Sequence, residues 1–179
     1  MEAPAPHKHF PCMASITALL FTQNDALRLG RALETLYACD DILVVDHGSQ
    51  DATVRVAREY GAKVVDARPG PSPADYVRSC SPESAKAGWI LCLDPHESLT
   101  EKLAASLFEW KSELVRGEAP AAPAFSVFLR EETAQGWVEV PAAQTRLVPL
   151  MWNSWKGMLP AHEPAAITLE GEVLRFVFP

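Results

Sequence analysis

Short apolar runs alternate with amphipathic stretches along the first part of the chain. Apolar runs without helical periodicity lie at 15–22, 42–45 and 63–65, as is typical of buried strands in a parallel sheet. The stretch after the first run has helical spacing, and four residues share its apolar face: Leu29, Leu33, Leu36 and Tyr37. A second helix is predicted to end at Gly61. This order predicts a βαβαβ unit whose parallel sheet is covered by helices.

A proline-rich segment separates this unit from the next strand and helix. Residues 69–73 contain three prolines and are predicted to lack regular structure. The apolar run 89–93 predicts a buried strand, and Ser98 or Thr100 is expected to cap the helix that follows. The spacing of the apolar residues predicts that this helix packs four of them inward: Leu103, Leu107, Trp110 and Leu114.

Beyond Pro123 the pattern changes to strands. Four segments are predicted to be extended: 124–131, 136–140, 145–152 and 166–178. A chain of 179 residues is long enough for one domain with a proper core. We therefore expect one domain over 15–179, with a nucleotide-binding half at 15–115 and a β-rich acceptor-side half at 124–179. Residues 1–14 are expected to form a flexible lead-in.

Composition excludes several classes of function. The chain has 16 basic and 23 acidic residues, a formal net charge of −7. Non-specific binding to nucleic acid or to an anionic membrane surface needs a basic face, so this balance argues against both. No apolar stretch reaches the ~18–20 residues of a membrane span, and the N-terminus lacks a signal pattern.

The four cysteines form no C-x-x-C pair and are predicted to be free thiols in a reducing cytoplasm: Cys12, Cys39, Cys80 and Cys92.

Polar side chains follow three of the predicted strands. They are Thr22 with Asn24, then Asp46, then Asp94 with His96. Open α/β sheets bind ligands at the carboxyl edge, where these strand ends are expected to meet. Aspartates there can accept hydrogen bonds from a base or ribose, or ligate a divalent cation. They can equally cap the following helix or form a simple turn, and the residues alone leave both interpretations open.

Four segments, taken in order, resemble motifs of one enzyme family. SITALLFTQND is similar to an apolar strand followed by T-K-N-E, and ILVVDHGSQDAT is similar to a segment with D-S-G-S-x-D-x-T. WILCLDPHESLTEKL is similar to W-I-L-x-L-D-A-D-E-x-L-S-x-E-L, and TRLVPLMWNSWKGMLPAHE to an R-L-F stretch that leads to H-E. Together they resemble the family 2 glycosyltransferases of the GT-A fold, especially bacterial lipopolysaccharide-core β-glucosyltransferases. The resemblance runs from Ser15 to Glu163.

The resemblance implies a GT-A-like, Rossmann-like three-layer α/β sandwich with a mainly parallel sheet and a β-rich C-terminal part. It implies transfer of a sugar from a nucleotide-diphosphate sugar to a hydroxyl of a carbohydrate or lipid-linked acceptor, with inversion, in the synthesis of cell-envelope polysaccharide. A cytoplasmic protein, peripheral at the inner face of the membrane, is expected. Because the chain ends at Pro179, we expect a minimal acceptor side, or one completed by a partner or an oligomer.

The resemblance also assigns residues to the donor. Thr22, Asn24 and Asp46 match the family's nucleotide-contacting positions, where they would hold the base and the ribose. Arg78 falls on the family's basic position and would meet the diphosphate. Ser79 stands where the family has asparagine.

The metal and catalytic positions follow in the same way. The family's metal-binding D-x-D is Asp94-Pro95-His96 here, and histidine suits Mn²⁺ better than Mg²⁺. Mn²⁺ is therefore the expected cation. Glu163, in the H-E position, is the expected catalytic base, while His162 would orient it or contact the donor.

One alternative function fits the sequence, and a second lacks the motif that it requires. The altered metal motif favours a catalytically inactive GT-A-like domain that serves as a nucleotide-sugar-binding or interaction module. A nucleotidyltransferase would need a glycine-rich phosphate loop after the first strand, and TQNDALRLG at 22–30 does not provide one. A test of nucleotide binding with and without Mn²⁺ separates the enzyme from the inactive module.

Overall fold

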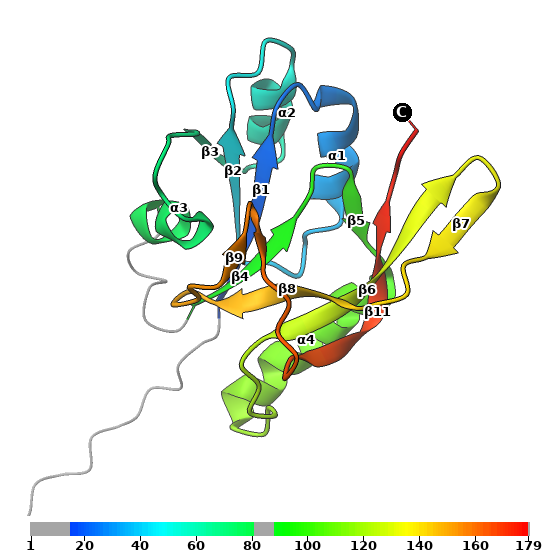
Figure 1. Ribbon diagram of the computed structural model, residues 1–179. Helices are drawn as coiled ribbons and strands as arrows, with labels where there is room; N and C mark the ends of the chain where they lie inside the picture. Colours follow the sequence, from blue (N-terminus) through cyan, green and yellow to red (C-terminus); the bar gives the residue numbers. More distant parts are fainter. Residues whose placement is uncertain (1–14, 81–87, 179) are drawn as a thin grey trace, which may run out of the picture.

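The computed structural model describes residues 15–80 and 88–178, so the predicted lead-in and Cys12 lie outside the described residues. One nine-stranded sheet runs through the molecule (Figure 1). Its first four strands are β3 (Lys63–Asp66), β2 (Asp41–Asp46), β1 (Ser15–Thr22) and β4 (Gly88–Leu93), in that order and all parallel. The predicted parallel α/β half is confirmed.

The second half of the sheet is built mainly from the C-terminal residues. From β4 the order continues through β8 (Gln144–Pro149), β6 (Phe125–Thr133), β11 (Ile167–Arg175) and β5 (Glu97–Leu99). β7 (Gly136–Glu139) forms a hairpin with β6. β8 is antiparallel to both β4 and β6, whereas β6 and β11 are parallel. The predicted β-rich C-terminal part is therefore confirmed.

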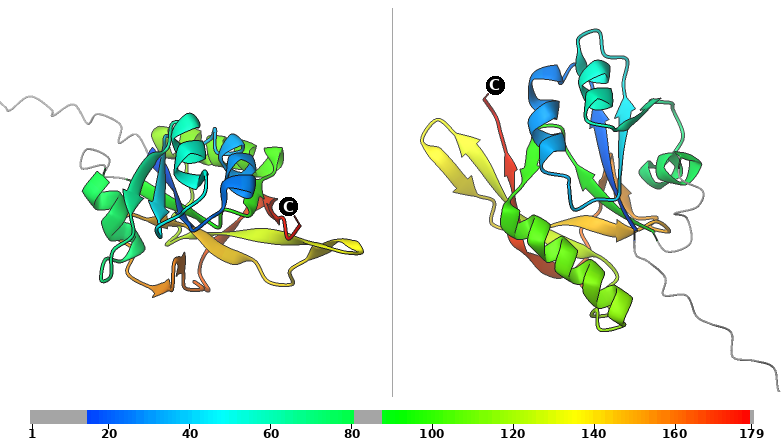
Figure 2. Two further views of the ribbon diagram at one scale, coloured as in Figure 1. Left: turned by 90° about the horizontal axis from the view of Figure 1, so that it is seen from above. Right: turned by 180° about the vertical axis from the view of Figure 1, so that it is seen from behind.

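Helices cover both faces of this sheet and make three layers (Figure 2). On one face lie α1 (Ala26–Glu34), α2 (Thr53–Glu59) and α4 (Glu101–Arg116), which share one apolar core with the sheet. A second core on the other face contains α3 (Pro73–Cys80) and apolar side chains of the hairpin β9–β10 (Trp155–Lys156 and Leu159–Pro160). Among the described residues, every helix is too short or too polar to cross a membrane.

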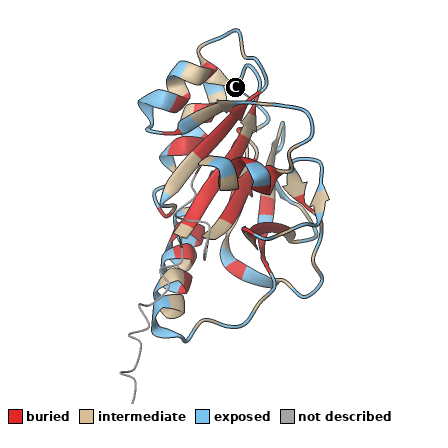
Figure 3. Cartoon of the chain, turned by 90° about the vertical axis from the view of Figure 1, so that its left-hand side faces the viewer, coloured by how far each residue is buried: buried red, intermediate tan, exposed pale blue. Residues whose placement is uncertain are grey.

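Burial on both faces explains the unbroken apolar runs of the parallel strands. In β1 the run from Ile16 to Leu20 is almost completely buried, and the central strands form the buried red band in Figure 3. A strand with helices on both sides has no solvent face, so its sequence does not alternate. Cys92 is buried in β4, and burial raises the pKa of its thiol to about 12. Cys39, Cys80 and Cys92 are free thiols, as predicted.

Helix α4 confirms the most detailed packing prediction. The Leu103 N–H donates to Thr100 Oγ1 at 3.3 Å, which caps the helix, and Gly117 ends it with a left-handed φ of 74°. Trp110 is only 3% exposed and packs its ring against Trp89 and Phe125. The other predicted inward residues also lie in the core: Leu103 and Leu107 are buried, and Leu114 is partly buried.

Two sequence predictions are wrong. α3 begins at Pro73, within the segment predicted to be irregular, because proline at the first helical position loses no intrahelical hydrogen bond. Tyr37 does not lie on a buried helix face. α1 ends at Glu34, so Tyr37 falls in the following turn, is 59% exposed and stacks on Phe108.

Candidate functional site

The three polar strand ends meet at one edge of the sheet, as predicted. Thr22 and Asp46 are register partners at the carboxyl ends of β1 and β2. Leu93, the last residue of β4, pairs with Leu20, so Asp94 follows at the same edge. Parallel strands place these ends together, which is where open α/β sheets bind ligands.

Asp46 is buried and holds the turn after its own strand. Its carboxylate accepts hydrogen bonds from Thr22 Oγ1 at 3.3 Å, from the Ser49 hydroxyl, and from the N–H groups of Gly48 and Ser49 at 3.1 and 2.9 Å. Burial by itself would raise the pKa of Asp46, but hydrogen bonds from Ser49, Thr22 and Gly48 outweigh burial and lower the pKa below its usual value. The carboxylate is therefore ionised at neutral pH.

The lowered pKa predicts how the stability of the protein depends on acid. Because the folded-state pKa of Asp46 lies below the unfolded value, its contribution is complete above about pH 4–5 and disappears as the pH falls through the folded value. Asp46→Asn should thus be less stable than the parent at pH 7, and this difference should shrink towards pH 2. Urea unfolding at a series of pH values measures it. A difference that stays constant over the whole range contradicts the prediction.

The loops after β1 and β2 are tied to each other. Asn24 has a left-handed φ of 59°; its N–H donates to Ser49 Oγ at 2.9 Å, and its Oδ1 accepts from the Gln50 N–H at 2.8 Å. Asp51 accepts from the N–H groups of Thr53 and Ala26, at the starts of α2 and α1. Both loops therefore present a preformed polar surface at the sheet edge.

His96 joins this surface to the loop after β4. Its Nε2 lies 3.1 Å from Asp25 Oδ1, and its Nδ1 lies 3.9 Å from Asp94 Oδ1. Asp94 Oδ1 also accepts from the His96 N–H at 2.9 Å. The sequence prediction missed Asp25, although it ends the QND segment and stands where the family motif has an acid. The structure thus brings together Asp94, His96 and Asp25.

These side chains provide a partial set of metal ligands. Among residues 15–80 and 88–178, no group of three or more acid, histidine or cysteine side chains is arranged to hold a metal ion by itself. Asp94 and His96 can supply one carboxylate oxygen and one ring nitrogen. Asp25 contacts the other ring nitrogen, as carboxylates do behind metal-bound imidazoles. The set fits a cation whose other ligands are water and phosphate oxygens, as is usual for cations at nucleotide sites.

A buried ionic network supports the loop from behind. Glu97 is fully buried and receives Arg146 Nη1 and Nη2 at 2.9 and 2.8 Å, and Arg175 Nη2 at 2.7 Å. The Asp94 N–H also donates to Glu97 Oε2 at 2.9 Å. Glu97 therefore fixes the start of the loop that carries Asp94 and His96. Sequence reasoning missed this network because nothing in the pattern marks the three residues as neighbours.

Arg78 lies apart from the strand-end residues. Its Nη2 forms an ion pair with Asp75 at 2.6 Å, and its Nη1 donates to the Leu150 carbonyl at 2.9 Å. Hydrogen bonds lower the pKa of Asp75 to about 2, and the bond from Ser72 contributes more than the bond from Arg78. Arg78 thus connects α3 to Leu150, whose N–H donates to the Gly88 carbonyl at the start of β4. Asp94 follows the other end of β4, so the expected place of Arg78 at the diphosphate is wrong.

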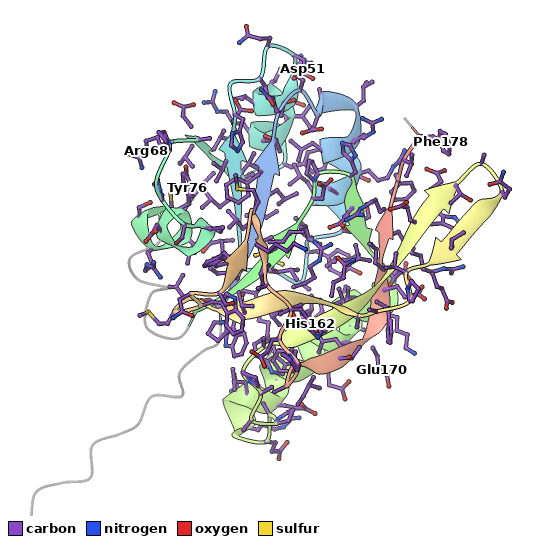
Figure 4. All side chains as sticks on the ribbon, in the orientation of Figure 1. Asp51, Arg68, Tyr76, His162, Glu170 and Phe178 are labelled. Atoms are coloured by element: carbon purple, nitrogen blue, oxygen red, sulfur yellow. The ribbon has the colours of Figure 1, made fainter. Side chains whose placement is uncertain are left out.

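His162 and Glu163 have different surroundings. The Glu163 N–H donates to Thr145 Oγ1, and its Oε1 accepts from the Ala165 N–H, both at 3.0 Å, so its side chain stabilises its own turn. His162 is exposed and lines a cavity of about 490 Å³ together with Arg146 and Lys156. Figure 4 shows His162 beside β8, well separated from Asp51 at the α2 end of the view.

Comparisons with curated proteins give partial matches to glycosyltransferases. No protein-family model matches the chain. The chain is 35% identical over 94 residues to an uncharacterized glycosyltransferase of Rickettsia felis, covering 51% of this chain and 32% of that protein. It is 40% identical over 55 residues to a 4,4'-diaponeurosporenoate glycosyltransferase of Staphylococcus aureus, covering 29% and 15%. A TPR repeat-containing protein of Synechococcus elongatus is 33% identical over 127 residues, covering 70% and 30%.

Solved structures give weaker likenesses. S. aureus TarS, residues 1–349, is 18% identical with a TM-score of 0.43, covering 72% of this chain and 38% of that one. Glucosyl-3-phosphoglycerate synthase from Mycobacterium tuberculosis, in complex with Mn²⁺, UDP-glucose and phosphoglyceric acid, is 19% identical with a TM-score of 0.41, covering 68% and 45%. The chain spans about a third or less of the curated relatives described above. The curated matches confirm a resemblance to glycosyltransferases over about half of the chain, whereas the lipopolysaccharide-core branch stays a prediction.

Proposed function

We propose that this chain contains the donor-binding part of a glycosyltransferase that moves a sugar from a nucleotide-diphosphate sugar to an acceptor hydroxyl. The observation that carries the proposal is the contact of His96 with Asp25, next to Asp94, at the carboxyl edge of the sheet. This contact places the His96 imidazole beside the Asp94 carboxylate, at the position where the resemblance implies the metal-binding motif. Similarity to curated glycosyltransferases over about half of the chain supports the same function.

The loops after β1 and β2 would hold the nucleoside. Asp46 is ionised and already fixed by hydroxyl and N–H donors, so a ribose hydroxyl would share its oxygens with the turn. Thr22 and Asn24 would line the same surface. Because Asn24 and Ser49 already join the two loops, binding would need little reordering of the backbone.

Asp94 and His96 would hold the cation, and Asp25 would orient the ring of His96. When bound, the cation supplies positive charge that stabilises the departing diphosphate. Arg78 does not add to this charge, because it binds the Leu150 carbonyl, and the Leu150 N–H donates to Gly88 at the start of β4, the end opposite Asp94.

The acceptor hydroxyl would be deprotonated by the pair at 162–163. Glu163 is engaged with the Ala165 N–H, whereas His162 faces the cavity beside β8. We therefore place His162 next to the acceptor, as the group that takes the proton, and assign Glu163 the positioning of this turn. One direct displacement by the hydroxyl would invert the anomeric centre.

Nucleotide binding tests the proposal. UDP or GDP with Mn²⁺ should raise the melting temperature, and Asp94→Ala should weaken this binding at least about 10-fold, because it removes a charged ligand. His96→Asp should keep binding and shift the metal preference towards Mg²⁺. Glu118→Ala is the control, because Glu118 is an exposed carboxylate beyond the end of α4. If Asp94→Ala binds as tightly as the parent, the metal-dependent enzyme is excluded.

An inactive nucleotide-sugar-binding or interaction module is the second candidate. It is favoured by the incomplete ligand set of the described residues and by the engagement of Asp46 with its own turn. This candidate predicts nucleotide binding that does not change with Mn²⁺, or no binding. A cytoplasmic location at the inner membrane face, a lipid-linked acceptor and a partner or oligomer on the acceptor side stay predictions from the sequence.

A further inference from the structure

A cavity of about 490 Å³ lies between the start of β8 and the β9–β10 hairpin. Its volume is in the range of small-molecule sites, roughly 300–1,000 Å³. Apolar groups form part of its wall, chiefly Val140, Leu159 and Pro160. Basic groups form another part, from Arg146, Lys156 and His162.

The charge of this cavity differs from that of the chain. The chain has a formal net charge of −7, yet none of the residues that line the cavity is acidic. The charge of Arg146 is matched by buried Glu97. The Lys156 ammonium, by contrast, forms no ion pair or hydrogen bond within the part of the chain that the structure describes, and Lys156 lines the cavity from the β9–β10 hairpin. The cavity therefore offers one uncompensated ammonium group, with the His162 imidazole on its wall.

We propose that this cavity binds an anionic acceptor, a small hydroxylated molecule that carries a phosphate or carboxylate group. Lys156 contacts the anionic group, because an ammonium without an acidic neighbour gains most from an oxyanion. The apolar wall packs against the carbon skeleton, and the hydroxyl faces His162. The acceptor role rests on the proposed function, whereas the binding of an anion rests on the cavity alone.

The inference is tested by titrating the full chain with glycerol 3-phosphate, with inorganic phosphate and with glycerol. NMR chemical shifts of the backbone amides report the binding. Glycerol 3-phosphate should shift the amides of residues 142–146 and 156–162, phosphate should shift fewer of them, and glycerol none. Lys156→Gln should weaken glycerol 3-phosphate binding by about five-fold or more, as expected for loss of one charge-assisted contact. Lys102→Gln, an exposed lysine paired with Glu170, is the matched control and should bind as the parent does.

The outcomes separate this inference from the proposed function. Equal affinity of the parent and Lys156→Gln overturns the inference. Shifts confined to residues 46–49 and 94–97 also overturn it, because the anion then occupies the position of the donor diphosphate. UDP with Mn²⁺ is titrated separately. If UDP binds but glycerol 3-phosphate shifts no amide of the cavity, the inference fails and the proposed function stands. If glycerol 3-phosphate binds in the cavity but UDP does not bind, the anion site is supported and the transferase is refuted.

Discussion

Replacement of Glu97 by glutamine is expected to lower the free energy of unfolding by about 3–5 kcal/mol, because it removes one partner of a buried ion pair. Glu97 is 0% exposed and Arg146 is 1% exposed, with two contacts of 2.8–2.9 Å between them. Glutamine keeps the shape but leaves the Arg146 guanidinium without a counter-charge. The Arg146 Nε already has no hydrogen-bond partner among the described residues, and besides Glu97 the guanidinium meets only neutral acceptors, the Cys92 carbonyl and Gln144 Oε1. Urea unfolding at pH 7 measures the loss.

The matched control for Glu97 is a second glutamate in the same network. Glu131 pairs with Arg175 at 3.3 Å, but its side chain is 41% exposed. Glu131→Gln should cost only about 0–1 kcal/mol, as surface pairs do. Glu97→Gln should also weaken Mn²⁺-dependent nucleotide binding, because the Asp94 N–H donates to Glu97. Equal stability of the two variants would show that the buried pair does not hold this loop.

The parallel half of the fold could be predicted because its physics is local. The run 15–22 is buried on both faces, and its sequence shows this directly as apolar residues without alternation. The same holds for α4, where the cap at Thr100 and the spacing to Trp110 are both local signals. The helix that begins at Pro73 has no such signal, because proline breaks a helix interior yet starts a helix well, and only the fold decides which position it takes.

The site could be predicted only as far as the strand ends. Parallel strands bring Thr22, Asp46 and Asp94 to one edge whatever their order in the sheet. Contacts between distant segments carry no such signal. Asp25 and His96 are 71 residues apart, and their contact depends on how the first turn of α1 meets the loop after β4. The pairing order of β8, β6 and β11 is equally non-local, so the neighbours of Glu97 could not be foreseen.

Gly171→Ala is expected to destabilise the protein by about 3–5 kcal/mol, because backbone strain and overpacking act together at this position. Gly171 lies in β11 with a φ of +94°, next to a register shift between Thr168 and Glu172. A Cβ there would lie 2.3 Å from the Leu103 nitrogen and 2.6 Å from its Cα. Those two atoms belong to the backbone of α4, so the clash cannot be relieved by the movement of a flexible side chain.

Neighbouring hydrogen bonds prevent the two elements from separating. The Thr100 N–H donates to the Glu172 carbonyl, and the Glu172 N–H donates to Thr100 Oγ1, both at 3.0 Å. Gly157→Ala is the matched control, since Gly157 has a φ of +65° and, among the described residues, no atom lies within 4 Å of the position that its new methyl group would take. It should cost only the strain of a left-handed residue, about 1–2 kcal/mol. Urea unfolding of both variants isolates the steric part, which comes from the close approach of β11 to α4. Equal losses would mean that β11 can move away from α4 at little cost.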